Sequence, residues 1–228
     1  MGKNIYRNLY DNKKNLGSLE ENPRIIKMVE IIGKLNLNGK NILDIGCHDG
    51  ALLSMIKNRQ NNFYGVDANE WAVSKAREKN IDTKQFFFND SESLPFEDNF
   101  FDMIIAGEIL EHIYDTDFFM KEIDRILKPS GKLLISTPNV ASLGRRLLLF
   151  FGVSPLIEIS PNEKDSCGHI RYFTFKTLED FLKKHHFQIL FETSDVINFS
   201  SRGKPRIKLS GRVFRNIGQS IICLCEKN

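Results

Sequence analysis

Short apolar runs alternate with amphipathic segments along most of this chain. The apolar runs are typical of strands in a parallel sheet that is covered on both faces, and the segments between them have apolar residues at helical spacing. This alternation predicts an α/β domain with a doubly wound sheet and helices on both faces. The predicted strands are 41–46, 62–67, 82–88, 101–107, 131–137, 187–193 and 219–225, and the predicted helices are 51–59, 70–79, 117–128 and one that opens at Thr174 or Thr177.

The alternation begins late in the chain and breaks once. Asn22 and Pro23 are typical of a helix start, since proline is tolerated at the first helical position, and isoleucines then recur at helical spacing. We therefore expect an N-terminal helical cap over residues 1–39 and a main domain over residues 40–228. Residues 139–170 lack the alternation, which predicts a lid insertion that lies over the strand ends.

Composition places the chain among ordinary globular proteins. Hydrophobic residues make up 41% and charged residues 27%. No apolar targeting segment opens the chain, and its longest apolar run, 147–153, is shorter than the roughly 20 residues that cross a bilayer, so a cytoplasmic location is expected. A net charge of +3 makes a nucleic-acid partner unexpected. The cysteines lack metal-ligand spacing, and Cys223 and Cys225 are expected on one face of a buried strand.

The segment "NILDIGCHDG" (41–50) carries the first functional signal. Gly46 and Gly50 follow the first predicted strand, and ligands of such sheets bind at the carboxyl ends of the strands. Asp67 ends the second strand, where an acid can hydrogen-bond a ribose diol. His48 stands between the glycines, so neither the dinucleotide spacing G-x-G-x-x-G nor a P-loop is present. The pattern predicts a nucleoside ligand with few phosphates.

Several segments together resemble the motifs of class I S-adenosylmethionine-dependent methyltransferases. They are "LDIGCHDG", "GVDAN", "NDSESLPFEDNFFDMIIAGEILEHI" and "LKPSGKLLISTPN", in the order and spacing of that family over about residues 40–139. His48 replaces a glycine of the first motif. The resemblance implies a Rossmann-like sheet of seven strands, mostly parallel with an antiparallel last strand, and S-adenosylmethionine as the cofactor.

The resemblance also implies which residues bind the cofactor. Asp44 and the two glycines would hold the methionine part, and Asp67 would hold the ribose hydroxyls. Asp90, with Ser91 beside it, would bind the adenine amine, and Glu108 would lie near the sulfonium. The full set of implied cofactor positions is Asp44, Gly46, Cys47, Gly50, Asp67, Ala68, Asp90, Ser91 and Glu108.

Two histidines are candidates for catalysis. Methyl transfer needs alignment and exclusion of water, and an oxygen or nitrogen acceptor also needs a base when it carries a proton. His112 in "GEILEHI" and His169 in "GHIRYFT" are the candidate bases. With Glu108 and Glu111 they could also hold a divalent cation, as in the small-RNA 3′-terminal 2′-O-methyltransferases that this pattern resembles. The segment also resembles that of ubiquinone-biosynthesis O-methyltransferases, and we prefer the interpretation without a metal.

The leading hypothesis is methyl transfer to an oxygen or nitrogen, less readily a carbon, of a small-molecule, lipid-like or glycan-precursor acceptor. The segment "RRLLLFFGV" could wall an apolar pocket, and residues 145–155 could touch a membrane surface. One alternative is a metal-assisted RNA 2′-O-methyltransferase, which the modest net charge disfavours. Another is a non-catalytic nucleoside-binding module, which only His48 supports. A nicotinamide-dependent oxidoreductase is disfavoured by the glycine spacing.

Overall fold

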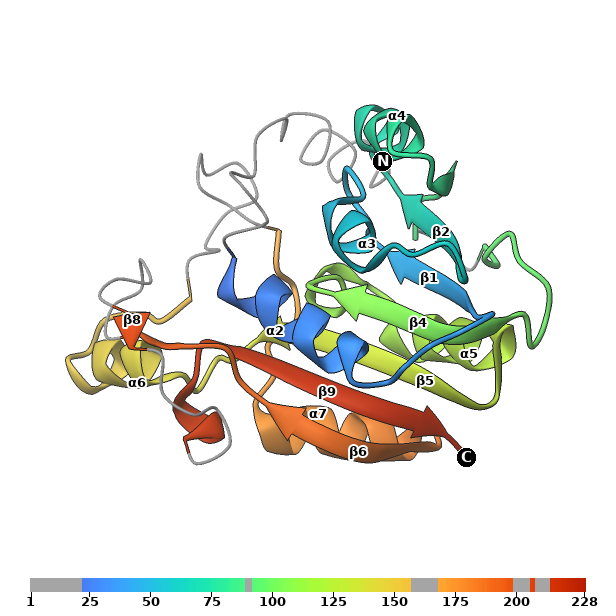
Figure 1. Cartoon of the computed structure of the whole chain (residues 1–228). Coiled ribbons are helices and arrows are strands. Elements are labelled where there is room, and N and C mark those ends of the chain that lie inside the picture. Colours follow the sequence, from blue (N-terminus) through green and yellow to red (C-terminus); the bar gives the residue numbers. More distant parts are fainter. Residues whose placement is uncertain (1–21, 89–91, 157–167, 199–205, 208–213) are drawn as a thin grey trace.

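The computed structural model describes residues 22–88, 92–156, 168–198, 206–207 and 214–228. Its centre is a seven-stranded sheet in the order β3-β2-β1-β4-β5-β9-β6 (Figure 1). Strand β9 runs antiparallel to both β5 and β6, and the other pairings are parallel. The predicted sheet, with its antiparallel last strand, is therefore confirmed. The strands are β1 (Asn41–Ile45), β2 (Asn62–Asp67), β3 (Asp82–Gln85), β4 (Phe101–Gly107), β5 (Leu127–Pro138), β6 (Phe187–Thr193) and β9 (Ser220–Lys227).

Helices cover both faces of this sheet, as the alternation of strands and helices predicts (Figure 1). One face carries α2 (Pro23–Gly33) and α3 (Ala51–Ile56) with α4 (Glu70–Glu78) beside them, and the other carries α5 (Thr116–Ile126) and α7 (Phe175–Lys184). The smaller elements are η2 (Leu110–His112), α6 (Leu143–Phe150), the two-stranded pair β7 (Ile197–Asn198) and β8 (Arg206–Ile207), and η3 (Arg215–Ile217).

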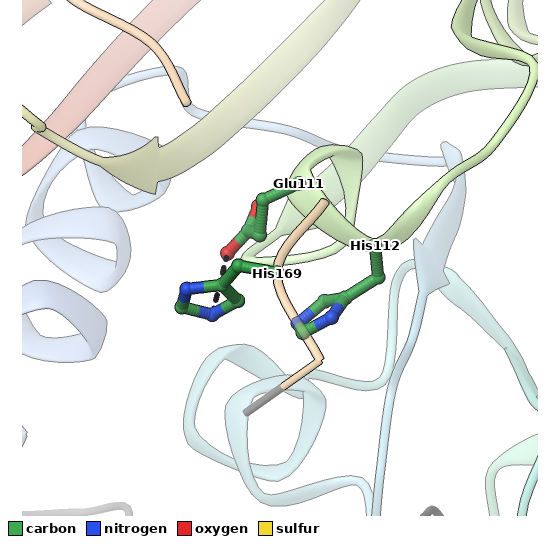
Figure 2. A group of neighbouring side chains, drawn as sticks. All are labelled: Glu111, His112 and His169. Atoms are coloured by element: carbon green, nitrogen blue, oxygen red, sulfur yellow. Dashed lines mark ion pairs between the residues drawn. The ribbon is translucent and has the colours of Figure 1, made fainter. Parts of the chain in front are cut away.

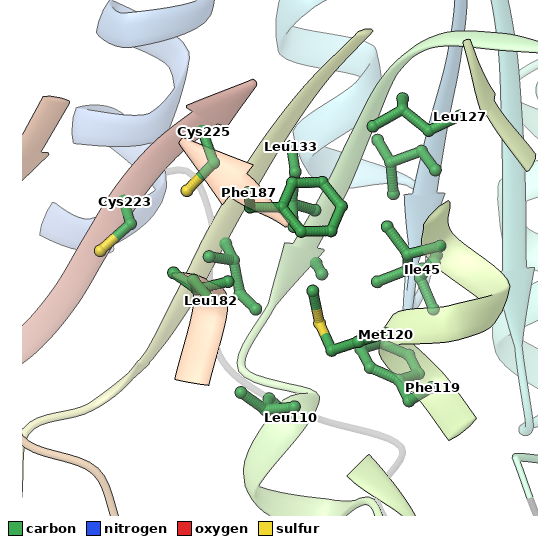
Figure 3. Packing of buried hydrophobic residues seen from close by; sticks show 14 of the residues in the cluster. Ile45, Leu110, Phe119, Met120, Leu127, Leu133, Leu182, Phe187, Cys223 and Cys225 are labelled. Carbon is green, nitrogen blue, oxygen red and sulfur yellow. The ribbon is translucent and has the colours of Figure 1, made fainter. Parts of the chain in front are cut away.

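The larger of the two hydrophobic clusters lies between the sheet and helices α5 and α7 (Figure 3). Phe119 and Met120 of α5 are fully buried there, as is Leu182 of α7. Cys223 and Cys225 of β9 point into the same cluster with no exposed surface, which confirms their expected place on one buried strand face. This apolar layer holds in position the strands whose carboxyl ends form the site.

Helix α2 begins where the sequence predicts. The Asn22 side chain accepts a hydrogen bond from the Arg24 N–H at 3.0 Å, and Pro23 occupies the first helical position. Apolar residues of α2, Met28 among them, pack on the sheet face that also carries α3. This packing places Arg24 near the strand ends. The division of the chain into 1–39 and 40–228 stays a prediction.

Several predicted boundaries are wrong. Strand β3 ends at Gln85 because its partner β2 ends at Asp67, whose carbonyl accepts the Phe86 N–H, and the chain then leaves the sheet. The run 86–88, predicted as strand, lies beside a cavity instead. Helix α3 ends three residues before its predicted end, and α5 ends at Ile126 because β5 starts at Leu127.

Within the predicted lid 139–170 the structure has helix α6, and residues 157–167 lie outside the described part. The lid itself stays a prediction.

None of the helices in the described ranges combines the length and the apolar character needed to cross a bilayer. The cytoplasmic location stays a prediction.

Aromatic packing at the base of β4 offers a test of the core. Phe101 has no exposed surface, and its ring meets Tyr64, Phe96 and Phe100 edge to face at 4.9–5.4 Å between centroids. We expect Phe101→Ala to lower the free energy of unfolding by about 3–5 kcal/mol, because it leaves a cavity that these rings cannot fill. The matched control Phe150→Ala, at a side chain that is 81% exposed, should change it by less than about 0.5 kcal/mol. Urea unfolding measures both, and equal losses would contradict the packing.

Candidate functional site

A cavity of about 400 Å³ lies at the carboxyl ends of β1, β2 and β4. Its size is in the range of small-molecule sites. The residues that line it include most of the predicted site positions, namely Asp44, Gly46, Cys47, Asp67, Ala68, Glu108, His112 and His169. Gly50 is not among the described residues that line the cavity, and Asp90 and Ser91 lie outside the described residues. The roles of all these residues stay predictions.

The loop after β1 turns sharply at three residues. Gly46, His48 and Gly50 have φ angles of 77°, 48° and 73°, in the left-handed region that favours glycine. His48 bears a cost of about 1–2 kcal/mol for this conformation, and it is nevertheless accommodated. A Cβ on Gly50 would lie 2.5 Å from the Cδ1 of Ile81, so this glycine allows α3 to pack beside α4. The sharp turn brings the loop backbone against the cavity.

Asp67 is the most firmly oriented acid of the cavity. Its Oδ2 accepts the His48 N–H at 2.8 Å, and its Oδ1 accepts the Asn69 N–H at 2.9 Å. Burial raises the pKa of this carboxyl, and the two N–H donors oppose that rise. A carboxylate accepts about four hydrogen bonds, so it can still accept hydrogen bonds from hydroxyl groups. This geometry suits the predicted ribose contact.

Asp44 is buried deeper, at 5% exposure. Burial raises the pKa of its carboxyl to about 8, the positive charge of Arg24 opposes the rise, and the negative charge of Asp67 adds to it. An acid in this environment releases its proton readily only when a cation arrives. Asp44 is thus suited to a ligand that carries an ammonium or sulfonium group.

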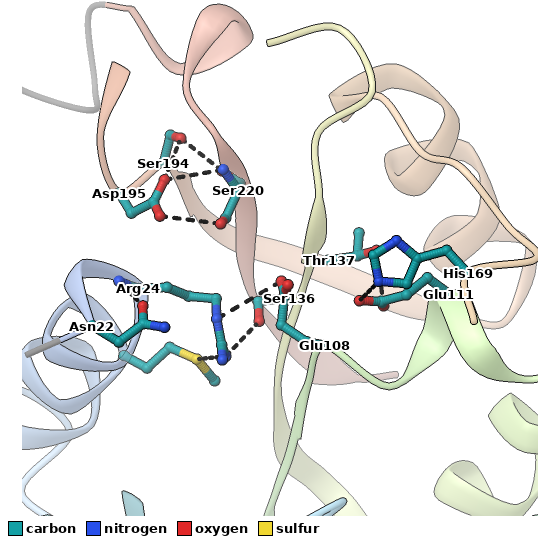
Figure 4. A network of polar contacts seen from close by, with 11 residues as sticks. Asn22, Arg24, Glu108, Glu111, Ser136, Thr137, His169, Ser194, Asp195 and Ser220 are labelled. Carbon is teal, nitrogen blue, oxygen red and sulfur yellow. Dashed lines mark hydrogen bonds and ion pairs between the residues drawn. The ribbon is translucent and has the colours of Figure 1, made fainter. Parts of the chain in front are cut away.

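Arg24 is a site residue that sequence reasoning missed. From the first turn of α2 it reaches over Gly107, where a Cβ would lie 2.9 Å from its Nη1. The Nη1 group donates to the Ser136 hydroxyl at 3.3 Å, and the Nε lies 3.8 Å from Glu108 Oε1 (Figure 4). Only the packing of α2 on the sheet brings this cation to the cavity, so no local sequence signal could have identified it.

Glu108 follows β4 and turns with a φ of 56°. Burial raises the pKa of its carboxyl, opposed by the charges of Arg24 and Arg145, while Asp195 adds to the rise. Together with Asp44 it gives the cavity a lining of acids that a bound cation would stabilise in their ionised form.

A second group of titratable side chains lies at one edge of the cavity (Figure 2). Nitrogen or oxygen atoms of Glu111, His112 and His169 all lie within 4.8 Å of one another. The Nε2 of His169 is 4.0 Å from Glu111 Oε1, and the two imidazole centroids are 4.8 Å apart. Glu108, predicted with this group, pairs with Arg24 instead.

These three side chains could hold a divalent cation only after moving closer together. Ligands bound at about 2.1 Å to one metal ion lie roughly 3.0–3.4 Å apart, shorter than the 4.0 Å between His169 and Glu111. The same 4.0 Å exceeds hydrogen-bond distance, so direct proton exchange between Glu111 and His169 also requires the two side chains to move closer.

Aromatic and apolar side chains make the remaining wall of the cavity. Phe86, Phe87 and Phe88 come from the segment after β3, and Ile109 and Tyr114 flank η2. Phe86 and Phe88 meet edge to face, with ring centroids 4.9 Å apart. Sequence reasoning missed this wall because a run of three phenylalanines equally predicts a buried strand.

Comparisons with known proteins give the family. A model of the methyltransferase domain matches residues 20–191. The chain is 33% identical over 122 residues to a ubiquinone biosynthesis O-methyltransferase of Coxiella burnetii, a match that covers 52% of this chain and 51% of that protein. The chain thus spans about half the length of the curated relatives it matches first. It is 26% identical over 215 residues to a demethylmenaquinone methyltransferase of Staphylococcus aureus, which covers 87% and 86% of the two chains.

A solved structure supports the fold. The S-adenosylmethionine-dependent methyltransferase of Thermotoga maritima, described as a possible histamine N-methyltransferase, has a TM-score of 0.63 at 20% identity over 90% of this chain and 89% of that one. Because the family model covers well over half of the chain, the protein belongs to the methyltransferase domain family, and the resemblance to class I S-adenosylmethionine-dependent methyltransferases is confirmed.

Proposed function

We propose that this protein transfers a methyl group from S-adenosylmethionine to an oxygen or nitrogen atom of a small-molecule acceptor. The observation that carries the proposal is the acid-lined cavity at the carboxyl ends of the strands. When bound, the cofactor supplies a methyl group on a positively charged sulfur. The names of the relatives, a ubiquinone biosynthesis O-methyltransferase and a demethylmenaquinone methyltransferase, support a quinone-related acceptor.

The polar groups of the cavity match the parts of this cofactor. Asp67 would accept the ribose hydroxyls, Asp44 would pair with the amino group, and Arg24 would pair with the carboxylate. The apolar segment 86–88 lines the same cavity as Asp67 and would pack against the flat adenine ring. Every charged end of the ligand then meets a side chain of opposite charge.

His112 and His169 would serve the acceptor rather than the cofactor. Both line the cavity beside Ile113 and Tyr114, which offer an apolar contact for an acceptor ring. The chain's main contribution to rate would be to hold the acceptor atom in line with the methyl group and to keep water out. The histidines would receive the proton that the acceptor loses.

Exposed apolar side chains on and after α6 support the predicted membrane contact through residues 145–155. Leu149, Phe150 and Phe151 are 65%, 81% and 74% exposed, and Val153 is 50% exposed. Large apolar side chains gathered in this way are typical of segments that bury themselves at a lipid surface. A lipid-like acceptor could then reach the enzyme from the membrane.

The proposed function is tested by ligand binding and turnover. We expect Asp67→Ala to weaken binding of S-adenosylhomocysteine by about tenfold to a hundredfold, because hydrogen bonds to a charged group contribute about 1.5–3 kcal/mol. Calorimetry measures the affinity, and production of S-adenosylhomocysteine in the presence of catechol or histamine measures turnover. Asp117→Ala, at a surface acid that bonds Lys184, is the matched control. No binding by the wild-type protein at millimolar ligand would contradict the proposal and favour a non-catalytic module.

The acid Asp44 should make ligand binding depend on pH. Its pKa of about 8 means that the free protein holds this proton at neutral pH, and pairing with the ligand's amino group requires its release. Affinity for S-adenosylhomocysteine should therefore rise by up to about tenfold per pH unit between about pH 6 and pH 8. Calorimetry in buffers of different ionisation enthalpy counts the released protons. In Asp44→Asn this released proton should disappear, and an unchanged proton count would contradict its assignment.

Membrane contact can be measured by sedimentation with vesicles of phosphatidylglycerol and phosphatidylcholine. We expect the wild-type protein to bind, and the double change Phe150→Ser and Phe151→Ser to weaken binding by about tenfold or more, since each buried CH₂ contributes about 0.8 kcal/mol. Phe214→Ser, at a phenylalanine that is 46% exposed outside this segment, is the control. Equal binding by all three proteins would contradict the contact.

A further inference from the structure

We infer that Glu111 and His169 form a proton-accepting pair that deprotonates a hydroxyl group of the acceptor, so that the protein methylates oxygen rather than an amine nitrogen. The inference rests on the proposed function, because it concerns the acceptor side of the same cavity. His169 is the group that contacts the acceptor, and Glu111 acts through it as a positioning residue.

The chain is built to hold these two side chains together. The Glu111 carbonyl accepts hydrogen bonds from the Ile170 N–H at 2.9 Å and the Arg171 N–H at 3.1 Å. The Gly168 carbonyl lies 3.1 Å from His112 Nδ1. These three contacts fasten the segment after residue 167 onto η2, with His169 between them. Two segments far apart in the sequence thus meet at a fixed distance.

Glu111 is a buried acid, so its ionised form needs a hydrogen-bond donor or a positive charge beside it. It is 1% exposed, and the Thr137 hydroxyl donates to its Oε2 at 3.1 Å (Figure 4). Its Oε1 is buried and accepts no hydrogen bond from the described residues, and His169 Nε2 lies 4.0 Å from it. Burial and the charge of Glu108 raise the pKa of this carboxyl well above its usual range. A buried acid of this kind is stabilised when a neighbouring imidazole becomes positively charged.

The 4.0 Å between His169 Nε2 and Glu111 Oε1 is longer than a hydrogen bond. Catalytic hydrogen bonds are commonly this long before the ligands bind and shorten afterwards. Among the described residues, the charged and titratable groups that face the pair are Glu108, Arg24 from α2 and His112 from η2. Since a carbonyl only accepts, the contact with Gly168 requires a proton on His112 Nδ1, which in the neutral imidazole leaves the lone pair on Nε2. His112 is therefore held in one tautomer beside the pair.

A base of this kind serves a hydroxyl group in particular. A phenolic hydroxyl has a pKa of about 10 and is a weak nucleophile until its proton leaves, whereas a neutral amine already has a free electron pair. The acceptor's O–H bond breaks and its proton passes to His169. The oxygen keeps that electron pair and bonds the methyl carbon, the bond from carbon to sulfur breaks, and sulfur keeps its electrons as a neutral thioether. The imidazolium favours the ionised form of Glu111, and this carboxylate stabilises the imidazolium until the imidazolium loses its proton to water.

The first experiment needs no acceptor. The chain has five histidines, so nuclear magnetic resonance of ¹⁵N-histidine-labelled protein with S-adenosylhomocysteine resolves each titration, and His169→Gln identifies the signal. We expect Glu111→Gln to lower the titration midpoint of His169 by about one pH unit or more, because a neutral amide cannot stabilise the imidazolium. Glu122→Gln, at another buried acid outside the cavity, should leave the midpoint in place. A midpoint that moves by less than about 0.3 unit in Glu111→Gln overturns the pair.

The second experiment uses catechol as a hydroxyl probe and histamine as an amine probe. Glu111→Gln should lower kcat for catechol by about a hundredfold to ten-thousandfold and move the acidic limb of the pH profile to lower pH, with KM and the affinity for S-adenosylhomocysteine changed by less than about threefold. Glu111→Asp should restore part of kcat. A loss that is equal at all pH values, or turnover of histamine that Glu111→Gln leaves unchanged, overturns the inference.

A third experiment, with a chelator, distinguishes proton transfer from metal chemistry. Turnover of catechol should persist after dialysis against EDTA. Loss of turnover, with recovery on addition of Mn²⁺, overturns the pair and assigns Glu111, His112 and His169 to a cation. In each of these failures the proposed function stands as long as S-adenosylhomocysteine still binds in the cavity, so the two claims fail separately.

Discussion

The structure depends on four buried or half-buried acids around one cavity, which outnumber the cations that the described residues place beside them. Asp44, Asp67, Glu108 and Glu111 all have carboxyl pKa values raised mainly by burial. Burial of an ionised carboxylate is unfavourable unless a positive charge or several hydrogen-bond donors compensate. Arg24 supplies part of this compensation. A ligand that carries a positively charged sulfur and an amino group would supply the remainder, and this requirement connects the fold to the proposed chemistry.

The fold creates this arrangement by geometry that is common to parallel sheets. Strands β1, β2 and β4 deliver their carboxyl ends to one edge, so the residues that follow them meet although they are distant in sequence. Helix α2, from the N-terminal part of the chain, packs on one face of the sheet and brings Arg24 to that edge. The segment that starts at Gly168 then closes the opposite side, where it bonds to η2. The two sides of the cavity, which we propose for the cofactor and the acceptor, are thus built from different parts of the chain.

The sequence was sufficient for the sheet and for the residues at the strand ends. Asp67 and Gly46 could be placed because their position depends only on where a strand stops, and strand periodicity shows that locally. Arg24 could not be placed, since its role comes from how α2 packs on the sheet.

Other features escaped prediction for different physical reasons. The segment 86–88 has the apolar pattern of a strand but leaves the sheet, because the neighbouring strand β2 ends at Asp67, whose carbonyl accepts the Phe86 N–H. His48 was recognised as a departure from the glycine motif, but its φ of 48° is a property of the folded loop. The separation of Glu108 from the group of Glu111, His112 and His169 also depends on tertiary contacts, since spacing along the chain would put Glu108, Glu111 and His112 on one helical face.

The most direct test of the account is a crystal structure of the protein with S-adenosylhomocysteine. The ribose hydroxyls should lie within hydrogen-bond distance of Asp67, the amino group should contact Asp44, and the sulfur should face the edge that holds His169. A ligand bound elsewhere, or a cavity closed by side chains with Asp67 turned away from it, would contradict the account.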